Sequence, residues 1–363
     1  MSQSSRLHVL LALTAVSVLS SATHAGAVVS PTTAPATRPA AVQADLSSPA
    51  AWADRLLDAA LTVEDFDTRA ELAGSAASIH LSLGRPDEAR RVAVTAMEGQ
   101  TPTASYYAAS LLTLAGRGDE AIDLAAADEE AWMTLGDVAL AAAWAGDDAT
   151  RLAAAERAGD DSGEAVTLFA AHLLRDDAEA GSRALKQLNG QIEEAFAYAT
   201  LAREYAYLDQ PKKAAAWEEQ AAATQAQAEA AGLADDDETL QFVLETRVAT
   251  LSGLSRPAEA EPLVLRMTDP WSKVYALHEV QAAYLRIGKA DEAERARRSA
   301  GLLMLANDVT TEDVAWSIGY VSAHDEEARR QIWLALDEPT YENATRAAGV
   351  AMGLLDQKLL ASE

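Results

Sequence analysis

The sequence predicts an all-α fold, a solenoid of about seven or eight antiparallel helix hairpins, on three observations. From Leu46 onward the composition is dominated by Ala, Leu, Glu and Arg, which are strong helix formers. Runs of β-branched residues bounded by turns are missing, so no substantial sheet is expected. A short acidic cassette recurs, and three of the four intervals between its copies are 32, 33 and 35 residues, a spacing typical of stacked helix-turn-helix repeats: Asp87-Glu88-Ala89, Asp119-Glu120-Ala121, Ala258-Glu259-Ala260, Asp291-Glu292-Ala293 and Glu326-Glu327-Ala328.

Residues 1–27 have the features of a secretory signal peptide. Arg6 precedes an apolar stretch from Val9 to Leu19, and the small residues Ala25-Gly26-Ala27 follow as a cleavage site. The apolar stretch is about eleven residues long, whereas roughly twenty are needed to cross a bilayer, so a permanent membrane anchor is the less favoured alternative. We therefore expect the mature chain to be exported, to the periplasm or the medium, without a transmembrane segment.

The mature chain is predicted to consist of a linker at residues 28–45 and one helical domain at residues 46–363. The linker contains Pro31, Pro35 and Pro39 among many Thr and Ala residues and has no helical periodicity. In the domain, Ala214 and Ala260 are 46 residues apart, so surplus residues are expected around 230–238.

The local sequence of the cassettes predicts how each hairpin turns. A shift of 204 residues superposes the segment 84–89 on 288–293. Gly84, Gly116 and Gly288 are expected to end one helix in the left-handed conformation, and Pro86 and Pro257 to begin the next. Small residues are expected where two helices approach closely, at Ala89, Ala121, Ala214 and Ala293.

These features resemble the tetratricopeptide repeat family, a helix-turn-helix unit of 34 residues. One set of residues on the family's packing positions is Leu277, Val280, Tyr284, Gly288, Ala293 and Ala300, and a second is Tyr198, Leu201, Ala202, Tyr205, Ala214 and Ala221. Arg297 and Glu218 depart from the pattern, since the family prefers a large apolar residue there. The resemblance implies a right-handed superhelix with a concave groove lined by Phe196, Arg203, Tyr207, Tyr275, His278 and Arg286.

Composition and motifs exclude several kinds of chemistry. The chain has no cysteine, which rules out disulfides and thiolate sites. With 29 Lys and Arg against 56 Asp and Glu, its net charge of −27 would repel nucleic acid, whereas a basic partner would be attracted. No histidine pair has metal-ligand spacing, and no phosphate-binding or serine-hydrolase motif occurs. We expect no metal, no cofactor and no catalytic residue.

The predicted function is that of an exported, non-catalytic scaffold or adaptor that holds a protein or peptide partner in its groove. Apolar groove residues would supply contact area, and Arg203 or Arg286 would pair with a carboxylate. Two alternatives stay open: a helical-toroid enzyme acting on a polysaccharide, and a purely structural repeat protein of the cell envelope. A closed ring would favour the enzyme, and an open superhelix would oppose it.

Overall fold

The computed structural model describes residues 45–105, 107–128, 133–159, 161–233, 237–311 and 314–361. The predicted signal peptide, and all of the predicted linker except Asp45, lie outside these residues. Every regular element in the described part of the chain is a helix, which confirms the prediction of an all-α protein. None of these helices is both long and apolar enough to cross a membrane.

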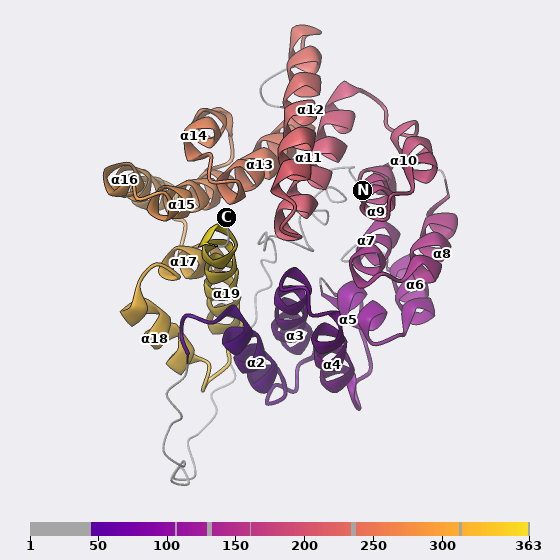
Figure 1. Ribbon diagram of the computed structural model, residues 1–363, viewed down its shortest axis with the longest axis horizontal. Coiled ribbons are helices and arrows are strands. Elements are labelled where there is room, and N and C mark those ends of the chain that lie inside the picture. The colour runs from indigo at the N-terminus through magenta and orange to yellow at the C-terminus, as the bar shows by residue number, and fades with distance from the viewer. Residues whose placement is uncertain are drawn as a thin grey trace.

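The helices alternate between an inner and an outer layer (Figure 1). Inner helices are α3 (Phe66–Ser82), α5 (Ala108–Leu114), α7 (Leu135–Ala145), α9 (Ser162–Leu174), α11 (Gln191–Tyr207), α13 (Glu238–Gly253), α15 (Pro270–Arg286), α17 (Ala315–Ser322) and α19 (Tyr341–Ala361). Outer helices are α2 (Pro49–Ala60), α4 (Pro86–Met97), α6 (Gly118–Ala127), α8 (Asp148–Ala158), α10 (Ala178–Leu185), α12 (Pro211–Ala230), α14 (Pro257–Arg266), α16 (Ala290–Ala306) and α18 (Glu326–Ala335). From α3 to α18 each inner helix packs on the outer helix that follows it, forming hairpins.

The layers close into a ring, because the last helix packs against the first two. Each inner helix contacts the next inner helix along the chain, and α19 contacts α2 and α3 (Figure 1). At this junction the buried Trp52 meets Trp333 edge-on, with ring centroids 4.9 Å apart. Arg55 of α2 also pairs with Asp337 at 2.6 Å. An open superhelix would leave its first and last hairpins apart, so the closed arrangement differs from the solenoid that the sequence predicts.

Seven hairpins share one turn, in which a single residue with positive φ ends the inner helix. The amide of the next residue then donates a hydrogen bond to the carbonyl five residues back, as in Arg85 N to His80 O at 2.8 Å and Lys289 N to Tyr284 O at 2.9 Å. The predicted left-handed glycines and the helix starts at Pro86 and Pro257 are confirmed. Residues at this turn position are Gly84, Gly116, Gly146, Asp176, Asp209, Ser255 and Gly288.

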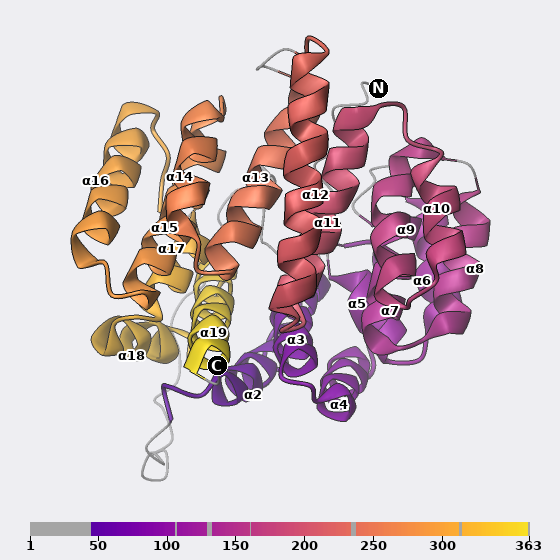
Figure 2. The ribbon, with the colours of Figure 1, turned by 45° about the horizontal axis from the view of Figure 1, so that its top comes forward.

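The irregular middle of the chain is mainly a longer helix. The outer helix α12 has 20 residues where α4 has 12, and it extends beyond its neighbours (Figure 2). A connection separates the end of α12 at Ala230 from the start of α13 at Glu238, where the sequence predicts surplus residues. Many of the residues that exceed the length of one repeat, however, belong to the longer helix α12. The alanines predicted at close helix approaches, Ala89, Ala121, Ala214 and Ala293, are all buried.

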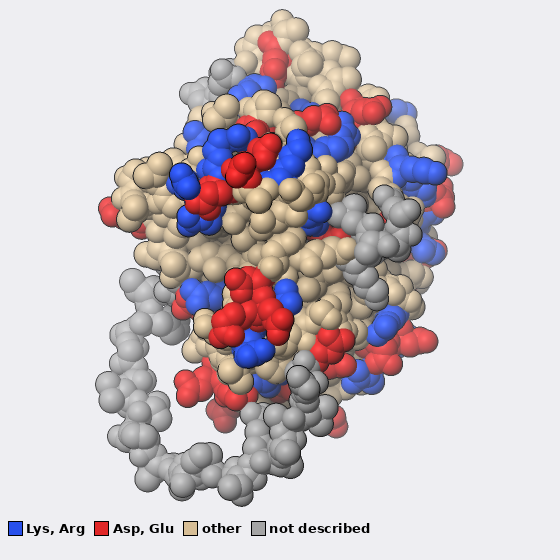
Figure 3. Space-filling view, turned by 60° about the vertical axis from the view of Figure 1, so that its left-hand side comes forward, with Lys and Arg blue, Asp and Glu red and all other residues tan. Residues whose placement is uncertain are grey.

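One outer face of the ring carries many charged side chains of both signs. On the face that carries α14, α16 and α18, acidic and basic side chains lie next to one another (Figure 3). On α16, for example, Glu294 accepts hydrogen bonds from Arg297 at 2.6 Å and from Arg298 at 2.7 Å. Exposed pairs of this kind contribute little to stability, because water screens the two charges.

The junction between α3 and α19 contains a buried acid. Glu71 accepts a hydrogen bond of 2.5 Å from the hydroxyl of Thr345, and it is 4% exposed. Burial raises the pKa of Glu71 from 4.5 to about 8, and the bond from Thr345 offsets only part of this effect. Because the folded pKa lies above the unfolded one, the stability that comes from keeping Glu71 neutral is complete below about pH 4.5 and is lost as the pH rises to about 8.

We therefore expect the variant Glu71→Gln to have a larger free energy of unfolding than the wild type at about pH 8. The difference between the two free energies should shrink toward pH 5, by at most about 1.4 kcal/mol per pH unit. Glutamine keeps an acceptor for Thr345 but has no proton to lose. Urea unfolding of both proteins over this range measures the effect. Parallel pH dependences of the two free energies of unfolding would show that Glu71 does not titrate at the junction.

Candidate functional site

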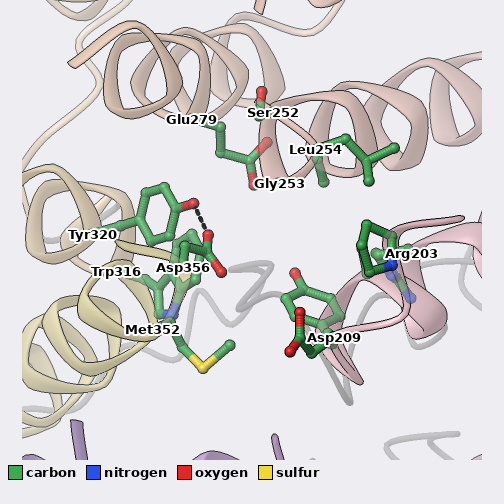
Figure 4. A pocket seen from close by; sticks show the side chains of 14 residues that line it. Arg203, Asp209, Ser252, Gly253, Leu254, Glu279, Trp316, Tyr320, Met352 and Asp356 are labelled. Atoms are coloured by element: carbon green, nitrogen blue, oxygen red, sulfur yellow. Dashed lines mark hydrogen bonds between the residues drawn. The ribbon is translucent and has the colours of Figure 1, made fainter. Parts of the chain in front are cut away.

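A cavity lies on the inside of the ring where five inner helices come together (Figure 4). Its volume is about 90 Å³. Since roughly 10–15 Å³ is enough for one water molecule, the cavity has room for several waters or for one small group. It is lined from α11, α13, α15, α17 and α19 and from the turn before α12, by Arg203, Ala206, Tyr207, Asp209, Pro211, Ala249, Ser252, Gly253, Leu254, Glu279, Trp316, Tyr320, Met352 and Asp356.

One side of the cavity holds a buried ion pair on α11. Arg203 is 2% exposed, and its Nη2 donates to Glu204 Oε1 at 3.4 Å. The second oxygen of Glu204 accepts a hydrogen bond of 2.9 Å from Trp144 Nε1 of α7. The Nε of Arg203 has no hydrogen-bond partner in the described structure. Arg203 is thus fixed in place but keeps donor capacity beside the cavity.

The opposite side is a network between α15, α17 and α19. Tyr320 donates a hydrogen bond to Asp356 (Figure 4) and accepts one of 2.8 Å from Arg286 Nη1. The same nitrogen lies 3.6 Å from Asp356, and Nη2 of Arg286 donates to the carbonyl of Ser252 on α13. Burial raises the pKa of Asp356 despite the lowering effects of Arg286 and Tyr320. The network fixes the orientation of Asp356 at the wall.

The position of Tyr320 and Asp356 depends on close packing between α17 and α19. A methyl group placed on Gly349 would lie 2.1 Å from the carbonyl oxygen of Trp316, and one on Gly319 would lie 2.0 Å from that of Arg346. Only glycine lets the two backbones approach this closely. These contacts bring the cavity-lining side chains of both helices together.

Glu279 is the acid of the cavity that no described side chain satisfies. It stands on α15, it is 9% exposed, and its carboxylate points into the cavity (Figure 4). No described group donates a hydrogen bond to it. Burial raises its pKa from 4.5 to about 8; Asp356 and Glu245 add to this effect, while Arg203 and Arg286 oppose it. At neutral pH Glu279 is therefore mostly protonated in the empty protein.

The residues predicted to line a groove separate into two groups. Arg203 and Tyr207 line the cavity, and Arg286 lies directly behind Tyr320 and Asp356. Tyr275 is half-buried and stacks on Trp316, with ring centroids 6.5 Å apart. These four surround one site, although they come from two separate repeats, two from α11 and two from α15.

Two predicted groove residues lie elsewhere. Phe196 is 2% exposed and stacks on Phe242 at 5.9 Å, so it belongs to the core between α11 and α13. His278 is 8% exposed, and its Nδ1 lies 2.8 Å from the hydroxyl of Ser317, within the contact of α15 with α17. Burial lowers the pKa of His278 to about 4, so this ring is neutral at pH 7.

Sequence reasoning missed Glu279, Trp316, Tyr320 and Asp356. Glu279 directly follows His278, but the repeat register assigned no role to it. The other three lie in α17 and α19, where no packing pattern of the repeat family was found. The small residues Gly319, Gly349 and Gly353 are the signal that could have paired these two helices.

Much of the cavity wall is already engaged by other parts of the protein. Within the described ranges no three His, Cys, Asp or Glu side chains are gathered as metal ligands. Trp316 is 4% exposed and is stacked by both Tyr275 and Tyr320, so its ring is already engaged by protein. What remains available to a ligand is Glu279, Tyr207 and the unused donor of Arg203.

The chain matches no protein-family model, and no curated protein has a similar sequence.

Proposed function

We propose that the protein is an exported, non-catalytic scaffold or adaptor that binds a partner protein through the inside of its ring. Its tetratricopeptide-like hairpins would form one right-handed turn whose ends meet, and the groove expected from the sequence would be the interior of that turn. The observation that carries the proposal is the buried Glu279, which points into a polar cavity without a hydrogen-bond partner in the described structure. A ligand that enters the cavity with a hydrogen-bond donor would find in Glu279 an acceptor that the described protein groups leave open.

The size of the cavity limits what enters it. With a volume of about 90 Å³ it can accept one side chain of a partner and not a folded segment. The remaining contact would lie on the rim of the ring interior, where the half-buried Tyr207 and Tyr275 supply rigid aromatic area. A single anchoring side chain surrounded by weaker contacts is a common arrangement in protein recognition.

The closed ring favours a second candidate, the helical-toroid enzyme. Glu279 and Asp356 both line the cavity with raised pKa values, as a pair of acid and base would. Against it, Trp316 is covered by two tyrosines and offers little free face on which a sugar could stack. Asp356 is already held by Tyr320 and Arg286. The adaptor therefore remains the better supported function.

Filling the cavity tests the adaptor proposal. Ala249 is a half-buried residue of α13 that lines the cavity, and Ala249→Leu would occupy part of it. A random peptide library displayed on phage would be selected on the full chain, and the selected peptides measured by fluorescence anisotropy. We expect Ala249→Leu to weaken their binding by about tenfold or more, which corresponds to about 1.4 kcal/mol.

The matched control is Ala216→Leu, the same change at an exposed position on the outer helix α12. It should leave the affinity unchanged. If no peptide is selected, or if both variants bind like the wild type, the ring interior is not the binding surface. Release of sugar from a polysaccharide by the wild type, lost in Glu279→Gln, would instead favour the enzyme.

A further inference from the structure

We propose that the cavity is a receptor for an organic cation on an alkyl stem, an ammonium or guanidinium group that pairs with Glu279. The inference rests on the proposed function and names the chemistry of the anchoring group. A lysine or arginine side chain of a partner protein would carry such a group, as would a free alkylamine.

The charges around the cavity favour a cation. Three acids line it, Asp209, Glu279 and Asp356, against one base, Arg203. Arg203 is engaged by the buried carboxylate behind it, and Asp356 is engaged by Arg286. Glu279 is left as the carboxylate that no described cation pairs with. In its ionised form Glu279 would repel an anionic ligand, whereas an ammonium or guanidinium supplies both the charge and the hydrogen-bond donor that this carboxylate lacks.

The other walls of the cavity suit the methylene chain of such a ligand. Besides Trp316, five lining residues are apolar, and they come from α11, the start of α12, α13 and the residue after it, and α19: Ala206, Pro211, Ala249, Leu254 and Met352. Lysine and arginine side chains bury their methylene groups against apolar surface while the charged end finds a polar partner. A bare metal ion would gain nothing from these walls, and no set of three metal-ligating side chains is present in the described residues.

Binding of a cation is expected to release a proton. Glu279 has a pKa of about 8 without ligand, so it is mostly protonated below that pH. A cation binds the carboxylate form and must displace the proton first. Affinity should rise by up to about tenfold per pH unit below pH 8 and level off above it. Titratable and charged groups facing Glu279 are Arg203, Glu204 and Tyr207 of α11, Glu245 of α13, Arg286 of α15, Tyr320 of α17 and Asp356 of α19.

Isothermal titration calorimetry of the full chain tests the proposal with three probes. These are n-butylammonium chloride, a capped pentapeptide with one central lysine among alanines, and the same peptide with norleucine in place of lysine. Titrations at about pH 6, 7, 8 and 9 in two buffers of different ionisation enthalpy count the protons released. We expect at least one of the two cationic probes to bind with proton release below pH 8 and the norleucine peptide not to bind.

The variant Glu279→Gln should abolish cation binding and its pH dependence, while Asp291→Asn, at an exposed acid on α16, should change neither. Thermal unfolding of Glu279→Gln controls for its fold, and because it removes a buried ionisable group it should be at least as stable as the wild type at pH 8. Binding of the lysine peptide alone assigns the cation to a protein partner, and binding of butylammonium alone assigns it to a free amine.

Failure of both cationic probes to bind, or binding that Glu279→Gln leaves intact, would overturn the inference. That outcome is distinct from failure of the adaptor proposal. Suppose that library peptides without Lys or Arg bind the wild type and bind Ala249→Leu more weakly. This result would support the cavity as the binding site and contradict only the proposal that its ligand is a cation.

Discussion

Replacing Gly349 with alanine is expected to destabilise the protein by about 3 kcal/mol, the upper end of the usual range for overpacking. A methyl group on this residue would lie 2.1 Å from the carbonyl oxygen of Trp316 and 2.8 Å from the amide nitrogen of Tyr320. These obstacles are backbone atoms of α17, so no change of rotamer relieves the clash. Helices α17 and α19 would have to separate, and Tyr320 would move away from Asp356.

Urea unfolding of Gly349→Ala measures this loss, and Gly301→Ala is the matched control. Gly301 lies in the interior of α16 with no atom within 4 Å of an added methyl group. Alanine there should stabilise the protein, by up to about 1 kcal/mol, through its higher helix propensity. Equal stability of the two variants would mean that α17 and α19 are not packed backbone to backbone.

Replacing Trp52 with alanine is expected to cost about 3–5 kcal/mol, as for other large aromatic side chains removed from a core. Trp52 is fully buried, its Nε1 donates to the carbonyl of Leu46 at 3.2 Å, and its ring meets Trp333 of α18 edge-on. Because it joins α2 to the C-terminal hairpin, its loss should also loosen the closure. Hydrogen exchange of the amides of α19 should then become faster.

Trp217→Ala provides the comparison at a distance from the closure. Trp217 stacks on Tyr198 at 5.5 Å and lies on α12, so its loss should destabilise the contact of α12 with α11. Exchange in α19 should stay close to that of the wild type in this variant. If both tryptophan variants affect α19 equally, the closure does not depend on the packing of α2.

The elements of the hairpins could be predicted because their determinants are local. A left-handed glycine such as Gly84 followed by Pro86 specifies one turn within a few residues, and the alanine at position 89 specifies the close approach that follows. Such signals do not depend on where a hairpin lies in the chain.

Closure of the ring could not be predicted in the same way, because it depends on pairs far apart in the sequence. Glu71 and Thr345, for example, are 274 residues apart. Whether the ends of a helical array meet depends on the sum of the angles between successive hairpins. No single residue specifies this sum.

The candidate site was only half predictable for a related reason. Arg203 and Tyr207 follow the repeat register and line the cavity, whereas Asp356 reaches it through the packing of α19 on α17, which lies outside that register. Phe196 was misplaced because the register of a degenerate repeat gives the side of a helix but not the depth of burial.

The most direct test of the account is chemical crosslinking across the closure, since the fold is a ring only if α2 meets the C-terminal hairpin. The chain contains no cysteine, so two can be introduced at will. Arg55 and Asp337 are in contact at 2.6 Å across the junction, whereas Arg183 lies on the outer helix α10, on the far side of the ring. The account predicts that a short bismaleimide joins Arg55→Cys to Asp337→Cys in the native protein and leaves Arg55→Cys with Arg183→Cys unjoined. Absence of a crosslink in the first pair under native conditions would contradict the closed ring.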